Sequence, residues 1–122
     1  MTSRGEGAAV RSDADLGASA AAVFRALGEP SRLALLRHLF TGEHQVRDLT
    51  EHLGLAQSTV SAHLACLREC GLVTVRSHGR SSIYGIAQPA LLATLLGDAD
   101  ALLADGGDPQ VCAVLRAESR AG

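Results

Sequence analysis

The sequence contains no lysine and no tryptophan, and its 122 residues include only three aromatic ones, Phe24, Phe40 and Tyr84. With so few aromatic side chains, the core must be built from leucine, valine, isoleucine and alanine. No apolar run approaches the roughly 20 residues of a transmembrane helix, and the first residues lack the apolar stretch of a signal peptide. We therefore expect a cytoplasmic protein without a membrane partner, in which arginine is the cationic side chain available to phosphates.

Cysteine is scarce as well, with Cys66, Cys70 and Cys112 as its three positions. In a reducing cytoplasm such residues are thiols or metal ligands more often than disulfides. Cys66 and Cys70 stand four apart in a predicted helix, which puts their Cβ atoms about 5–6 Å apart on one face. A disulfide needs about 3.5–4.5 Å, whereas a soft metal ion can bridge the longer gap. Two other readings stay open, buried core cysteines and a redox- or persulfide-sensing thiol pair.

Charge is small overall but unevenly distributed. The formal net charge is −2, yet residues 57–80 hold three arginines and one glutamate, whereas residues 87–122 hold five acids and two arginines. This asymmetry fits a DNA-facing surface on one side of a nearly neutral protein. The length suits one globular domain, to which oligomerisation would add stability.

Apolar residues recur at helical spacing in four segments of the first half of the chain. We place these helices at about residues 16–27, 30–41, 45–53 and 57–70. The turn Gly54-Leu55-Ala56 joins the last two, and Val60, Leu64 and Leu67 form the inward face of the last. Two helices joined by a short glycine-containing turn are typical of a helix-turn-helix.

The pattern then changes to β-branched runs at residues 72–76 and 82–86, which predict a β-hairpin with its turn at residues 77–80. A last helix, at about residues 89–104, is apolar nearly all round and favours pairing with a second copy of the chain. The fold class is therefore a mainly α, homodimeric winged helix-turn-helix with a β-hairpin wing. We expect a flexible arm at residues 1–14, the folded domain at residues 15–104 and a tail at residues 105–122.

The second helix of a helix-turn-helix inserts its N-terminal part into the major groove of DNA. The candidate DNA-reading residues there are Gln57, Ser58, Thr59, Ser61 and His63. Glutamine can pair with adenine, and hydroxyl groups reach bases or phosphates. Alternatively, Gln57 and Ser58 only cap the helix.

The hairpin supplies two further candidates, Arg76 and Arg80, which suit phosphate or minor-groove contacts beside the reading helix. The other histidines in the first half of the chain, at positions 38, 44 and 52, are expected to be scattered surface residues and not ligands. No serine–histidine–acid order, P-loop or glycine-rich nucleotide motif is present, so we do not expect an enzyme.

Two segments resemble the ArsR/SmtB family of metalloregulatory repressors, ALGEPSRLALLRHL at Ala26–Leu39 and LGLAQSTVSAHLACLRECGLVTVRSHGRSSIY at Leu53–Tyr84. The resemblance covers roughly residues 16–104 and implies a dimeric repressor that leaves operator DNA when it binds a metal. Two cysteines in LACLRECG and a third near the C-terminus are similar to the cadmium- and lead-sensing CmtR branch. This similarity implies a thiolate site of Cys66, Cys70 and Cys112, built from the reading helix and the tail of the other protomer.

The expected inducer is accordingly Cd(II) or Pb(II), with Zn(II), arsenite or antimonite as alternatives. The family's thiolate motif in the third helix would fall at residues 43–49, which contain no cysteine, and its last-helix site needs histidines, which are absent after His78. Two other functions remain open: a redox- or persulfide-responsive repressor of the same fold, and a winged-helix interaction module that binds no DNA.

Overall fold

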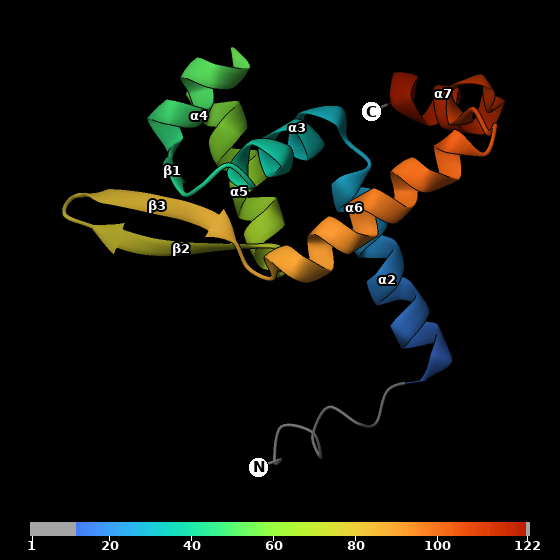
Figure 1. Cartoon of the computed structure of the whole chain (residues 1–122), viewed down its shortest axis with the longest axis horizontal. Coiled ribbons are helices and arrows are strands. Elements are labelled where there is room, and N and C mark those ends of the chain that lie inside the picture. The colour runs from blue at the N-terminus through green and yellow to red at the C-terminus, as the bar shows by residue number, and fades with distance from the viewer. Residues whose placement is uncertain (1–11, 122) are drawn as a thin grey trace. The chain divides into compact units, whose positions relative to one another are not determined.

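A computed structural model describes residues 12–121, and Figure 1 shows the order of the elements. The chain divides into two units, the first ending at Ala87 and the second beginning at Gln88, and each is described by itself. The first contains α2 (Asp13–Leu27), α3 (Pro30–Leu39), β1 (His44–Gln45), α4 (Val46–Leu53), α5 (Gln57–Glu69), β2 (Val73–His78) and β3 (Ser81–Ile86). The second contains α6 (Pro89–Ala104), the 3-10 turn η1 (Pro109–Val111) and α7 (Ala113–Ala121).

The helices begin where the sequence supplies a cap. Ser12 accepts a hydrogen bond from the backbone N–H of Asp15, so α2 starts earlier than predicted and includes residues 13 and 14 of the expected arm. Most of that arm lies outside the described residues. Glu29 caps α3 in the same way, and Pro30 fills the first helical position, where its missing N–H costs nothing.

The core of the first unit joins α3, α4, α5 and the sheet. The buried side chains are Ala26, Leu27, Leu35, Leu36, Leu39, Leu49, Val60, Leu64, Leu67, Val73 and Ile83. The inward set of α5 is confirmed, because Val60, Leu64 and Leu67 are fully buried. Those three side chains fix which face of α5 is turned outward.

The wing is a sheet of three antiparallel strands in the order β1-β3-β2. The predicted hairpin is present, but its strands reach His78 and Ser81, so the turn shortens to Gly79 and Arg80. Strand β1 was not predicted. Its two residues pair with Tyr84 and Ile83 of β3, a contact between segments almost forty residues apart that no local pattern indicates.

In the second unit, α6 has the predicted bounds, with Leu92 and Leu96 buried. The expected tail is more ordered than predicted, since η1 and α7 follow the loop after α6. Large apolar side chains stay exposed on this unit, namely Leu91, Leu102, Leu103, Val111, Val114 and Leu115. None of the described helices combines the length and the apolar character needed to span a bilayer.

A substitution at Gly54 tests whether the turn between α4 and α5 needs a left-handed residue. Gly54 ends α4 in that region, at φ 67°. Gly54→Ala is expected to lower the free energy of unfolding by about 1 kcal/mol through backbone strain. No described atom lies within 4 Å of the new Cβ, so a steric clash does not contribute. Gly17→Ala in α2 is the matched control, in open space with helical backbone, and should raise stability by up to about 1 kcal/mol. Urea unfolding followed by circular dichroism measures the free energy of unfolding of both variants. Equal changes in the two variants would contradict the left-handed conformation assigned to Gly54.

Candidate nucleic-acid interface and thiol pair

The start of α5 presents polar side chains to solvent. Gln57, Ser58, Thr59 and Ser61 are all exposed. The capping alternative for Gln57 and Ser58 is wrong, because the N-cap is Ala56 and no side chain caps this helix. The first backbone N–H groups of α5 therefore have no capping side chain, which suits a phosphate at this end of the helix.

His63 has a different environment from the other four candidates on α5. Its Nε2 lies 3.6 Å from Oε1 of Glu29, and only 16% of its side chain is exposed. The same Glu29 oxygen accepts the backbone N–H of Arg32 at 2.8 Å. His63 thus faces the N-terminus of α3, where it ties the reading helix to its neighbour, and the structure does not bring it to the exposed face.

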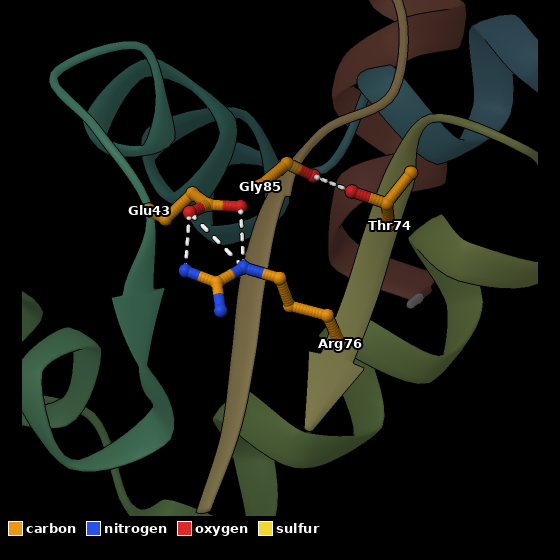
Figure 2. A network of polar contacts seen from close by, with 4 residues as sticks. All are labelled: Glu43, Thr74, Arg76 and Gly85. Carbon is orange, nitrogen blue, oxygen red and sulfur yellow. Dashed lines mark hydrogen bonds and ion pairs between the residues drawn. The ribbon is translucent and has the colours of Figure 1, made fainter. Parts of the chain in front are cut away.

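Arg76 in the wing is held by Glu43, as Figure 2 shows. The shortest contact, between an Nη2 atom and Oε1, is 2.8 Å, and both side chains are about half exposed. This hydrogen bond lowers the pKa of the Glu43 carboxyl below its ordinary value. Gly85 of β3 leaves room for the Glu43 side chain, because a Cβ there would stand 3.1 Å from Cγ of Glu43, a tight contact.

Arg80 lies in the two-residue turn at the tip of the wing, where its side chain is exposed. The structure therefore separates the two wing arginines. Arg80 projects from the tip, while Arg76 is paired with a carboxylate on the strand.

The cysteine pair lies at the other end of α5. The backbone N–H of Cys70 donates to the carbonyl of Cys66 at 3.1 Å, so the two residues are one helical turn apart, as predicted. Both thiols are free and half-buried. Burial raises the pKa of the Cys70 thiol, and the charge of Cys66 and a hydrogen bond with it act in the same direction. The positive charge of Arg32 opposes this effect.

Arg32 connects this end of α5 to α2. Its Nε donates to the carbonyl of Ala26 at 2.7 Å, and an Nη2 atom donates to the carbonyl of Arg25 at 3.1 Å. These carbonyls belong to the last turn of α2. Sequence reasoning missed Arg32, because its partners lie in an adjacent helix and nothing in the local pattern marks it.

The third cysteine belongs to the second unit. Cys112 is half-buried directly after η1, and its backbone N–H donates to the carbonyl of Pro109 at 3.0 Å. Among the described residues of one chain, no three histidine, cysteine or acidic side chains are arranged to hold a metal ion. Cys66 and Cys70 thus provide two soft donors one helical turn apart, without a third donor beside them among the described residues.

Known proteins share this arrangement of elements. Residues 29–75 match the family described as bacterial regulatory protein, arsR family. Over 95 residues the chain is 40% identical to the HTH-type transcriptional regulator CmtR of Mycobacterium tuberculosis, a match covering 78% of this chain and 80% of that protein. The chain belongs to the ArsR family.

Two further relatives bear on the fold and the activity of this ArsR-family chain. A probable mercury resistance operon repressor of Streptomyces lividans is 39% identical over 89 residues, 73% of this chain and 70% of that protein. A winged helix-turn-helix DNA-binding domain of Mycobacterium bovis, described as homodimeric, superposes with a TM-score of 0.70 at 31% identity, covering 81% and 93% of the two chains. The predicted winged helix-turn-helix is confirmed, and relatives that regulate transcription confirm that the chain is not an enzyme.

One expectation about the histidines of this ArsR-family chain is wrong. His38, His44 and His52 are not scattered, because their rings lie together, with centroids 4.3 to 6.3 Å apart. They come from α3, β1 and α4, so only the tertiary fold brings them into contact. Sequence spacing of six and eight residues gives no regular face that would have indicated it.

The thiol pair generates a prediction about reactivity. Cys66→Ser is expected to speed alkylation of Cys70 by iodoacetamide near neutral pH by about two- to fivefold, because it removes the neighbouring charge and thiol that raise the pKa of Cys70. Mass spectrometry of the peptide at several time points gives the rate. Cys112→Ser is the control, since Cys112 is not among the groups that shift Cys70. Equal Cys70 rates in the two variants would show that the pair is not coupled.

Proposed function

We propose that this chain is a homodimeric, metal-responsive transcriptional repressor, which binds operator DNA through α5 and the wing and releases it when its cysteines capture a thiophilic metal ion. The observation that carries the proposal is that one helix holds both sets of groups. Exposed polar side chains occupy the first turns of α5, and two half-buried thiols stand in its last turn, at Cys66, and at its C-cap, at Cys70.

The DNA contacts come from the exposed side chains Gln57, Ser58, Thr59 and Ser61 in the major groove, with Arg80 reaching the phosphates or minor groove from the wing. The uncapped first turn of α5 adds backbone N–H groups that can hold a phosphate. His63 supports the orientation of α5 through Glu29, and Arg76 contacts DNA only after it exchanges Glu43 for a phosphate.

A second copy of the chain is the proposed partner for the exposed apolar side chains. Phe24 of α2 is 59% exposed, and Leu91 and Leu102 of α6 are 66% and 73% exposed. Large apolar side chains exposed in this way mark protein contacts. The homodimeric Mycobacterium bovis relative supports the same assembly. In a twofold dimer the two α5 helices can reach successive major grooves of a palindromic operator, about 34–36 Å apart.

The proposed ligands for the metal are Cys66 and Cys70 of one protomer with Cys112, supplied across the dimer. Thiolates select soft ions, and when bound the ion supplies a stable bridge between these sulfurs. We favour Cd(II) or Pb(II) as inducer, with Hg(II), As(III) or Zn(II) as alternatives, since one relative is described as a mercury resistance operon repressor.

Arg32 provides a route from the thiols to the dimer. The guanidinium already acts on Cys70 and at the same time holds two carbonyls of α2. When the cysteines deprotonate to hold an ion, their charge attracts Arg32 and competes with those carbonyls. A change at the end of α5 thereby reaches α2, which carries the exposed Phe24.

Cadmium titration tests the proposal. An operator selected from random duplex DNA should bind the wild-type chain, and cadmium should weaken that binding by about 5- to 150-fold, the range of typical couplings. Fluorescence anisotropy measures the affinity, and ultraviolet absorption reports thiolate–metal bonds. Cys66→Ser should bind the operator equally well without metal but lose most of the response to cadmium.

Ser58→Ala with Ser61→Ala is the converse control. This variant should lose operator affinity, by about 1–3 kcal/mol for each specific contact removed, while its cadmium absorption stays that of wild type. A wild-type affinity that every thiophilic ion leaves unchanged would eliminate the metal response. A metal response that survives in Cys66→Ser would eliminate this site.

The wing generates a separate prediction. Glu43→Gln should tighten operator binding by about two- to fivefold at low salt and steepen its salt dependence by about one ion, because it releases Arg76 to a phosphate. Anisotropy titrations at several salt concentrations measure both effects. The double variant Glu43→Gln, Arg76→Gln should lose the gain. A gain that persists in the double variant would show that only net charge had changed.

A further inference from the structure

Three imidazole rings meet where α3, β1 and α4 come together. The ring centroid of His38 lies 4.5 Å from that of His44 and 4.3 Å from that of His52, and the last two are 6.3 Å apart. We call these three residues the histidine cluster. It contains no residue of α5 and no cysteine, so it is distinct from the proposed DNA and metal sites.

Hydrogen bonds at the end of α3 hold the ring of His44 in place. The hydroxyl of Thr41 donates its single hydrogen to the carbonyl of His38 at 2.7 Å. The same oxygen lies 3.1 Å from Nε2 of His44, and it must therefore accept a hydrogen from that ring. The ring of His44 is thereby tied to the end of α3.

His38 is at the centre of the cluster. Its Nε2 is buried and has no hydrogen-bond partner among the described residues. An unprotonated Nε2 can stay there at little cost. A charged imidazolium carries a hydrogen on both ring nitrogens, so it would bury an N–H group that has no acceptor. Burial therefore lowers the pKa of His38, and the charges of His52 and His44 lower it further.

Of the groups that shift the pKa of His38, one favours the protonated ring. Asp48 of α4 is the carboxylate that raises the pKa of His38, and its effect is smaller than the opposing ones. The Glu43 carboxylate forms an ion pair with Arg76. The residue paired with His44 on β3 is Tyr84, which is not a carboxylate. The other charged residues of α4, Arg47 and Glu51, are exposed.

The cluster occupies the corner that joins the wing to the helix-turn-helix. His44 belongs to β1, which pairs with β3 of the wing. His52 belongs to α4, which packs on the reading helix α5. Imidazole is the side chain whose ordinary pKa lies nearest neutral pH, so the proton is a ligand that this cluster can take.

We propose that the histidine cluster of His38, His44 and His52 is a proton-responsive switch, which loosens the corner between wing and helix-turn-helix in mild acid and so weakens operator binding. Like charges on neighbouring rings repel each other, and separation of the three elements from which the rings come would relieve that repulsion.

The direction in which pH changes the stability of the folded chain follows from the linkage between proton binding and folding. The pKa of His38 is lower in the folded chain than its ordinary value of about 6.5, so the unfolded chain binds more protons in the interval between them. The stability that His38 contributes is present above about pH 6.5 and is lost as the pH falls towards the folded pKa. Acid therefore destabilises the corner.

Thermal unfolding and operator binding, each measured from about pH 7.5 to pH 5.5 with reductant and a metal chelator, test the proposal. His52→Gln replaces an exposed ring and should leave the fold intact. Wild type is expected to lose about 4–8 °C more in Tm than His52→Gln over this range, and about three- to tenfold more operator affinity. Proton NMR of the ring hydrogens should show His38 titrating below about pH 6.5.

His78→Gln is the matched control, because His78 is exposed on the wing outside the cluster. It should keep the full wild-type pH dependence of Tm, the quantity for which it serves as control. The same pH dependence in His52→Gln as in His78→Gln, or a His38 ring that titrates at or above the ordinary value, would overturn the switch. The Tm measurement does not require DNA, so it tests the switch independently of the proposed repressor function. Failure of the repressor function would show instead as absent operator binding at every pH.

Discussion

The rotation of α5 about its own axis is the constraint on which the other features depend. Val60, Leu64 and Leu67 are fully buried and set that rotation. With this stripe inward, the exposed polar residues at the start of the helix and the half-buried thiols at its end keep fixed directions. A regular helix transmits displacement along its length, because its packed side chains fit only discrete arrangements. In the proposed function, ligands at the two ends of α5 would therefore compete for its position.

Local patterns were sufficient to predict most of the helices. Apolar spacing located α3, α5 and α6, and glycine or proline at the boundaries explained where they stop or begin. The hairpin followed from β-branched runs around Gly79. What could not be predicted depends on contacts distant in sequence. Strand β1 exists because His44 and Gln45 pair with β3, and two residues carry no periodicity of their own.

In the candidate site as well, the features set by local sequence were predicted and those set by tertiary packing were not. The spacing of Cys66 and Cys70 is a local property of a helix, so it was predicted from the sequence and is reproduced by the backbone hydrogen bond between them. The partners of His63, Arg76 and Arg32 are set by tertiary packing, and each was missed. Glu29 holds His63, Glu43 holds Arg76, and the last turn of α2 holds Arg32. Polar side chains that appear available in a sequence are thus partly committed to positioning α5 and the wing.

Competition between two ligands for one helix is reciprocal, since a metal that weakens DNA binding must itself be bound more weakly in the presence of DNA. The most direct measurement is therefore the cadmium affinity of the wild-type dimer, determined by competition with a calibrated chelator, with and without saturating operator. The account predicts that operator lowers the cadmium affinity by the same factor by which cadmium lowers the operator affinity. Equal cadmium affinities in the free and DNA-bound states would contradict it.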